Sequence, residues 1–170
     1  IADCVADFLK ISTFRKAEYV KSTLYSNVNY NEAQRVLELC LQTIEKANKY
    51  YDGYFKGTQW DDAYYQIVYY QAVATANVTR MMIFKSLNNF YARQKSSLAN
   101  VYASLVDECI AYDKELTDYY NNDMSNGKWK KMMSSPHVGF VTWNSDGWSY
   151  PESKKIPLSN EAKMLVSVDG

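Results

Sequence analysis

The sequence is short of glycine, proline and histidine, and each shortage excludes a class of structure or site. Six glycines and three prolines in 170 residues provide few helix breaks, so we expect long helices with few connections. His137 is the only histidine, which excludes a two-histidine metal site. Cys4, Cys40 and Cys109 form no C-x-x-C pair, so we expect buried free thiols and neither a metal nor a cofactor. In an oxidising compartment one pair could instead form a disulfide.

Charge and hydropathy exclude two classes of partner. Nineteen basic residues balance nineteen acidic ones, which argues against nucleic-acid binding driven by overall charge. No apolar run approaches the roughly 18 residues of a membrane span, so no membrane partner is expected. Sixteen tyrosines suit half-buried helix faces, which we favour, or sugar-stacking surfaces. The chain begins with Ile1 and carries no signal peptide there, so we expect a fragment or a processed product.

Apolar residues recur every three or four positions, which predicts an all-α fold, an antiparallel bundle of about four to five helices. The first helix is expected over about 2–20. The second should begin at Asn31, which with Gln34 resembles a capping box, and should end at Gly53 and Gly57.

Two further helices complete the predicted bundle. One follows Thr58 as its cap, with Asp61 and Asp62 in its first turn, and it is apolar nearly all round, which places it in the middle of the bundle. The sequon at Asn77 lies inside this helix, and we interpret it as chance. The last helix has a solvated side that should include Asp107, Glu108, Asp113 and Glu115. Its near-heptad seam should consist of Leu98, Val101, Leu105, Cys109, Tyr112, Leu116 and Tyr119.

The chain changes character after Pro136. We expect a helical bundle over 1–135, in which 128–133 can add a short helix, and over 136–170 an aromatic-rich loop and the start of a truncated β domain. The stretches 138–141 and 162–168 have strand-like composition. The loop aromatics could stack on sugar rings or plug the bundle against a neighbouring domain. These aromatics are Trp143, Trp148 and Tyr150.

Two sets of short motifs occur in the order and spacing of a known enzyme family. The first set is FRKAE at 14–18, YS at 25–26 and NYNEAQR at 29–35. The second is NFYARQ at 89–94, GKW at 127–129, MM at 132–133, HVGF at 137–140 and Trp143, with IP at 156–157. From about residue 8 to 160 the chain resembles the helical domain of glycoside hydrolase family 115. Ala17 stands where the family often has proline, and 144–148 replaces a more proline-rich stretch, which affects any sugar contact at that loop.

The family consists of xylan α-1,2-glucuronidases, which remove glucuronic acid or its 4-O-methyl ether with inversion. The resemblance implies a barrel-type catalytic domain before this segment and a β-sandwich domain after it, both partners within one chain. Inversion uses a carboxylic acid and a carboxylate with a water between them. The resemblance places both in the preceding domain, so we expect no catalytic residue here. It also implies contact with xylan through the parent enzyme, a secreted or periplasmic location, and a face that could form a homo-oligomer.

Three residues near the implied domain junction are candidates for supporting the catalytic cleft: Arg15, Asn29 and Tyr30. Two other classes of function stay open. In a stand-alone helical carbohydrate-binding module, Trp143, Trp148 and Tyr150 would form one exposed flat surface. A protein-interaction bundle would instead expose an apolar groove.

Overall fold

The structure is a computed structural model that describes residues 1–13, 19–139 and 149–158. The regular elements in these ranges are all helical, which confirms the predicted all-α bundle, and no strand occurs among the described residues. The strand-like stretches at 140–141 and 162–168 lie outside the described residues, whereas 138 and 139 form a bend. The α-helices are α1 (Ala2–Thr13), α2 (Glu32–Tyr50), α3 (Asp61–Tyr64), α4 (Tyr70–Arg93) and α5 (Leu98–Asp118).

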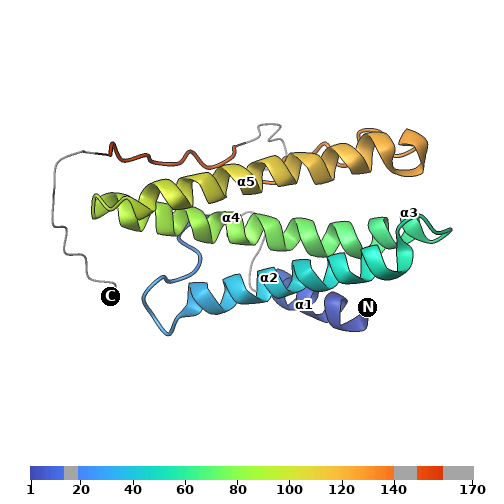
Figure 1. Ribbon diagram of the computed structural model, residues 1–170, viewed down its shortest axis with the longest axis horizontal. Coiled ribbons are helices and arrows are strands. Elements are labelled where there is room, and N and C mark those ends of the chain that lie inside the picture. Colours follow the sequence, from blue (N-terminus) through green and yellow to red (C-terminus); the bar gives the residue numbers. More distant parts are fainter. Residues whose placement is uncertain (14–18, 140–148, 159–170) are drawn as a thin grey trace.

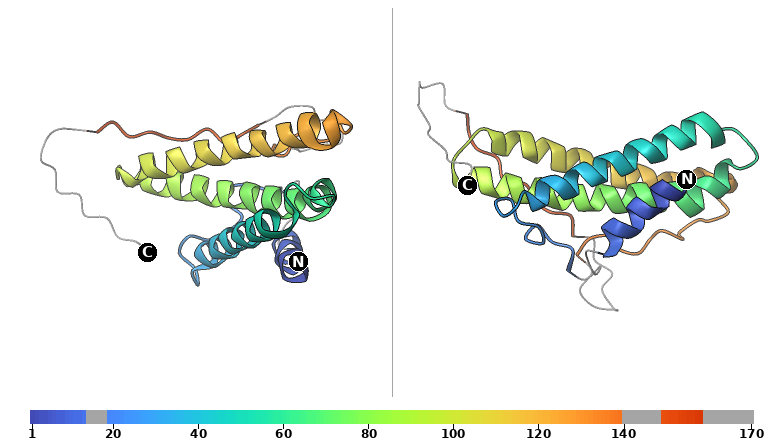
Figure 2. Two further views of the ribbon diagram at one scale, coloured as in Figure 1. Left: turned by 45° about the vertical axis from the view of Figure 1, so that its right-hand side comes forward. Right: turned by 90° about the horizontal axis from the view of Figure 1, so that it is seen from below.

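Helix α4 lies in the middle of the bundle, as its all-round apolar sequence predicts. It runs antiparallel beside α5, and α2 lies along its other side (Figure 1). Helix α1 packs against both α2 and α4 (Figure 2). Because α4 contacts three helices, residues from all round it are buried, including Val73, Ala76 and Met81. No helix in the described ranges combines the length and the apolar character needed to cross a bilayer.

The face that α5 turns to α4 differs from the predicted seam in its first half. Ala99 and Ala103 are completely buried, whereas Leu98 is 44% and Val101 is 53% exposed. The small alanine side chains allow the two backbones to approach, so that Asn88 of α4 donates a hydrogen bond to the Ala99 carbonyl at 2.8 Å. The larger side chains of this half are therefore turned outward. In the second half the predicted Cys109 and Leu116 are buried.

Three five-residue π-helical turns lie at one end of the bundle, on the right of Figure 1. They are η2 (Tyr51–Phe55) after α2, η3 (Tyr65–Tyr69) between α3 and α4, and η4 (Tyr119–Asp123) after α5. A π turn inserts an extra residue into a helix and changes the direction of the side chains that follow. A short 3₁₀ turn, η5 (Met124–Gly127), completes this end.

Helix α2 begins directly after Asn31, as the sequence predicts, whereas α3 begins at Asp61 rather than directly after Thr58. Asn31 has φ 51° and its side chain caps nothing; instead the Glu32 carboxylate accepts a hydrogen bond from the Ser26 backbone N–H at 2.8 Å. A left-handed backbone at Asn31 turns its side chain away from the helix end. Thr58 donates to the Phe55 carbonyl and thereby closes the turn before α3. The predicted end at Gly57 is confirmed, since this residue has φ 75°, whereas Gly53 lies inside the π-helical turn η2.

Two expected helical stretches differ from the prediction. Helix α1 covers Ala2–Thr13 of the expected 2–20; 14–18 lie outside the described residues, and 19–20 are not α-helical. The stretch 128–133 forms turns, and within it Lys131 has φ 66°, which a right-handed helix does not allow.

Buried side chains confirm two further expectations. All three cysteines are free and buried. The sequon at Asn77 is fully buried in α4, where its amide donates to the Cys109 carbonyl at 2.9 Å, so its interpretation as a chance match is confirmed.

Candidate functional site

The structure separates the residues that the sequence singled out as candidates. Arg15, Trp143 and Trp148 lie outside the described residues. Asn29 and Tyr30 lie in the turn before α2, where the Asn29 backbone N–H donates to the Ser26 hydroxyl at 2.9 Å. The Tyr30 side chain is 91% exposed. An aromatic ring that projects this far has little to pack on within the bundle and is available to a neighbour.

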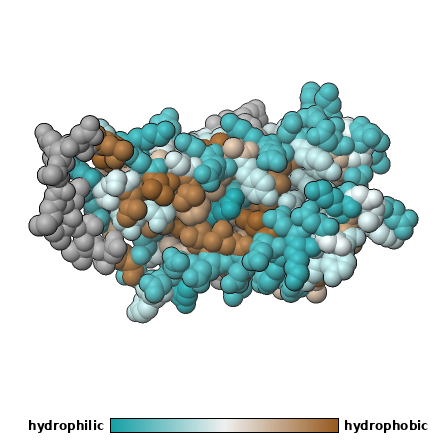
Figure 3. Space-filling model, in the orientation of Figure 1, coloured by the Kyte–Doolittle hydropathy of each residue, from teal (hydrophilic) through white to brown (hydrophobic). Residues whose placement is uncertain are grey.

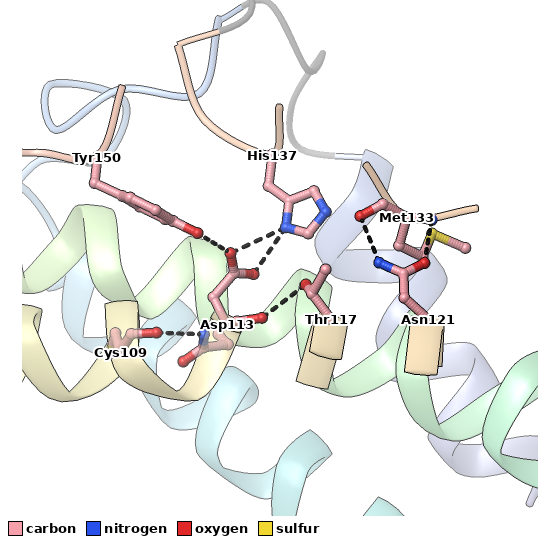
Figure 4. A network of polar contacts seen from close by, with 8 residues as sticks. Cys109, Asp113, Thr117, Asn121, Met133, His137 and Tyr150 are labelled. Carbon is pink, nitrogen blue, oxygen red and sulfur yellow. Dashed lines mark hydrogen bonds and ion pairs between the residues drawn. The ribbon is translucent and has the colours of Figure 1, made fainter. Parts of the chain in front are cut away.

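Tyr150 is directed inward and forms part of a buried polar network with Asp113 (Figure 4). The Tyr150 hydroxyl donates to Oδ2 of Asp113 at 2.6 Å, and Nδ1 of His137 lies 3.0 Å from both carboxylate oxygens. Burial and the neighbouring carboxylate both raise the pKa of Tyr150, so the hydroxyl keeps its proton and remains a donor. This network joins the segment around 137–150 to α5.

The expectation that Asp113 lies on a solvated helix face is wrong. Its side chain is fully buried, because Tyr150 and His137 cover the face of α5 that the helical pattern alone leaves open. A buried carboxylate is tolerated when its oxygens are paired with donors, and here two side chains provide them.

Three asparagine side chains hold the backbone that follows the helices. Each binds both the N–H and the C=O of a single residue, as a neighbouring strand would. Asn121 holds Met133 (N–H to Oδ1 2.9 Å, Nδ2 to O 3.2 Å). We call the described residues of 133–139 and 149–156 the C-terminal strap.

The other two asparagines hold the far part of the strap. The Lys154 N–H donates to Oδ1 of Asn88 at 2.9 Å, and Nδ2 of Asn88 donates to the Lys154 carbonyl at 2.8 Å. Asn100 binds Ile156 in the same way, at 2.7 and 2.9 Å. Since neither residue belongs to a strand or helix, these amides satisfy backbone groups that regular structure would otherwise pair.

Apolar contacts complete the attachment of the strap. Val138 is buried against Val78 and Met82 of α4, with Tyr150 packed beside them. Gly139 has φ 82°, and a Cβ there would lie 2.3 Å from the Ser149 Cβ, so this position requires glycine. The strap therefore closes on itself at Gly139 and Ser149, where the Ser149 N–H donates to the Val138 carbonyl.

These anchors give no signal in the sequence, because no helical periodicity marks them. Asn88 and Asp113 each occupy a completely buried helix position, where a polar residue needs a specific partner. That mismatch between polarity and burial can be recognised only once the register of the helices is known. Asn100 and Asn121 are half-buried and give no such signal.

A cavity with acidic residues lies at the π-helical end, but it does not have the arrangement of a glycosidase centre. Its carboxylates are Asp52, Asp61, Glu115, Asp118 and Asp123. The Asp61 carboxylate accepts hydrogen bonds from the Tyr51 hydroxyl and the Gly57 N–H, and the other four carboxylate residues are exposed. A general acid for glycoside hydrolysis is kept protonated by an apolar environment, which exposed carboxylates lack. We assign no catalytic role to these residues.

Within the described ranges, no three His, Cys, Asp or Glu side chains form a group that could hold a metal ion. A scan against models of known protein families finds no match for the sequence, and a search of curated proteins finds no match either.

Proposed function

We propose that this chain is the non-catalytic helical module of a multidomain xylan α-1,2-(4-O-methyl)glucuronidase, in which it braces the catalytic domain. One observation supports this proposal above the others. Two of the motifs that resemble glycoside hydrolase family 115, MM and HVGF, contain residues that attach the C-terminal strap to the helices. These motif residues thus have a structural role, namely to attach the strap. A structural role is what we expect of the characteristic residues of a non-catalytic module.

A third motif, GKW, lies just before the strap. In GKW, Gly127 has φ 73°, and a Cβ there would lie 3.0 Å from the Asn122 carbonyl oxygen. Trp129 packs against the buried cluster that includes Tyr120 and Met124. In the MM motif, Met133 is held by Asn121. In HVGF, His137 binds Asp113 and Val138 is buried.

The proposed role is mechanical. Helices α4 and α5 form a stiff pair, and the strap runs along α5 away from the π-helical end (Figure 1). A chain held at three asparagines and one aspartate would fix the direction in which a following β-sandwich domain is attached. The hydrolytic acid and base belong to the preceding domain in this proposal, and xylan reaches the module only through the parent enzyme, in the periplasm or outside the cell.

The exposed residues before α2 extend the proposal to the catalytic cleft. Tyr30 projects from the bundle, Asn29 directly precedes it, and Arg15 belongs to the earlier motif FRKAE. We expect them to support the cleft of the catalytic domain. In the full-length enzyme, Asn29→Ala should lower the rate of glucuronate release, and an unchanged rate would contradict this part of the proposal.

A protein-interaction bundle is the second candidate, and one observation favours it. Apolar atoms gather between α2 and α5 on the face seen in Figure 3. Leu41 of α2 and Val101 of α5 are among the exposed apolar side chains. In the parent enzyme the same face would serve as a contact with another domain or a second copy. A stand-alone carbohydrate-binding module is the weaker alternative, because the hydroxyl end of Tyr150 is occupied by Asp113.

Two measurements test the proposal. Sequencing the gene on both sides of the part that encodes this chain should reveal a barrel-type catalytic domain before it and a β-sandwich domain after it. An open reading frame limited to the bundle would contradict it. The purified chain, checked for helicity by circular dichroism, should release no glucuronate from aldouronic acids, and release above the buffer control would equally contradict it.

A further inference from the structure

We propose that the cavity at the π-helical end binds an organic ammonium ion. This inference is independent of the proposed xylan enzyme. The cavity has a volume of about 800 Å³, which is within the range of small-molecule sites. Five tyrosines line it, and we call it the tyrosine cavity: Tyr51, Tyr65, Tyr69, Tyr112 and Tyr119.

The tyrosine rings form one connected group. The ring centre of Tyr65 lies 4.6 Å from that of Tyr119 and 5.0 Å from that of Tyr69. The ring centre of Tyr69 lies 4.9 Å from that of Tyr51. The π turns η2, η3 and η4 provide four of the five rings, because each turn begins or ends with a tyrosine that lines the cavity. Aromatic faces carry the negative part of the ring quadrupole and attract cations.

Hydrogen bonds fix two of these rings by their hydroxyl groups. The Tyr51 hydroxyl donates to Oδ1 of Asp61 at 2.8 Å, and the Tyr69 hydroxyl donates to Oδ1 of Asn48 at 2.7 Å. The Tyr69 hydroxyl also lies 3.3 Å from that of Tyr112. The rings are therefore positioned before any ligand arrives, so little ordering is needed on binding.

The charge around the cavity selects a cation. Five carboxylates line it, and Lys56 is the one basic side chain among its lining residues. The surplus of negative charge repels uronic acids, so this cavity is not suited to the substrate of the proposed parent enzyme.

The chain itself places an ammonium in the cavity. The Lys56 Nζ atom lies 5.6 Å from the centre of the Tyr51 ring and 3.3 Å from Oδ1 of Asp52. The Lys56 side chain is 63% exposed, and an ion pair at such exposure is weak. A diffusible ammonium can therefore displace it. Aromatic rings with nearby carboxylates form the kind of site that recognises alkylammonium groups in other proteins.

The test is a titration of the full chain at low ionic strength with tetramethylammonium chloride and, separately, with spermidine, followed by tyrosine fluorescence and by NMR. We expect saturable binding of both, with spermidine the tighter because it carries more charge. Sodium chloride at equal ionic strength and tert-butanol, a neutral compound of similar shape, should leave the cavity signals unchanged. A response to sodium or tert-butanol equal to that to tetramethylammonium, or no response at all, would overturn the proposal.

Variants of exposed residues identify the site without disturbing the fold. Glu115→Gln combined with Asp123→Asn should weaken spermidine binding about tenfold, because two carboxylates near the cation are lost. Lys56→Ala should strengthen tetramethylammonium binding about threefold, since it removes the competing ammonium. Asp107→Asn with Glu108→Gln, also on α5 but outside the cavity lining, is the matched control and should bind like the original chain. Equal losses in the cavity and control variants, or weaker binding by Lys56→Ala, would contradict the assignment.

Discussion

The helix pair α4–α5 and the C-terminal strap lie against each other, but different forces hold them. The helices are joined by buried apolar side chains, such as Met81 and Phe84 of α4 and Val106 of α5. The strap is held by a few side chains that bind its backbone or cover a single carboxylate. Because the apolar contacts are many, the helices stay packed together when any one of them is lost. Each polar anchor, in contrast, is the main attachment of its own stretch of the strap. The strap should therefore detach locally under changes that leave the helices intact.

The largest effect is expected from removing apolar volume between the helices. Met81→Ala should lower the free energy of unfolding by about 2–5 kcal/mol, because Met81 is completely buried and its loss leaves a cavity. Urea unfolding followed by circular dichroism measures this, and the strap should unfold in the same transition. Met132→Ala is the matched control, because this methionine is 54% exposed and its loss should cost under about 0.5 kcal/mol. Equal stability of the two variants would contradict the location of the core.

A pH effect should follow from a thiol between the helices. Burial is the main cause that raises the pKa of Cys109 from 9.0 to about 11, and the nearby Arg80 partly opposes it. The unfolded chain therefore loses this proton at lower pH than the folded chain, and the stability that the thiol contributes is fully present below pH 9 and is lost as the pH rises through 11. The loss should reach up to about 3 kcal/mol.

The buried tyrosines also have raised pKa values, so the thiol contribution must be isolated by a variant. Cys109→Ala should lose less stability between pH 9 and 11 than the original chain does. If the free energy of unfolding changed equally with pH in the two proteins, Cys109 would ionise equally in the folded and unfolded chains, which would contradict this prediction.

An intermediate effect is expected at the carboxylate that anchors the strap. Asp113→Ala leaves the Tyr150 hydroxyl and His137 without their shared acceptor, at a cost of about 1–3 kcal/mol. Limited proteolysis should then cleave the chain between 133 and 156 faster, while the helices keep their far-ultraviolet spectrum. Asp107→Ala, on the exposed side of α5, should be cleaved like the original chain. If Asp113→Ala instead melts all helices together, the strap is not a separate unit.

The smallest effect is expected at one hydroxyl. Tyr150→Phe keeps the ring against Val78 and Met82 and removes one donor to Asp113, so it should cost about 1 kcal/mol. Hydrogen exchange should show faster opening near 149–150 and no change at Met133. A loss as large as that of Asp113→Ala would mean that His137 contributes nothing.

The helices could be predicted from the sequence because burial imposes a period of 3.6 residues on them. That period identifies α2, α4 and α5 and places α4 in the middle. It fails at Leu98 and Val101 of α5, since hydrophobic residues need not face the core where small alanines allow closer packing.

The strap could not be predicted because a few side-chain bonds with no period define it. Asp113 has the sequence context of a solvated residue, and only His137 and Tyr150, which follow much later in the chain, bury it. Tyr150 was singled out for its ring, but its hydroxyl makes the decisive contact. The motifs at 127–139 lie next to and within the strap, but they gave no indication of its contacts. The tyrosine cavity went unnoticed because the three π turns that assemble it shift the helical register.

Amide hydrogen exchange measured by NMR tests the central claim most directly, namely that asparagine side chains hold the strap on α4 and α5. The amides of Met133, Lys154 and Ile156 should exchange well below the rate of an unstructured chain, since each donates to an asparagine oxygen. Asn100→Ala should abolish the protection of Ile156 and leave that of Met133 intact. Exchange of all three amides at the unstructured rate in the original chain would contradict the account.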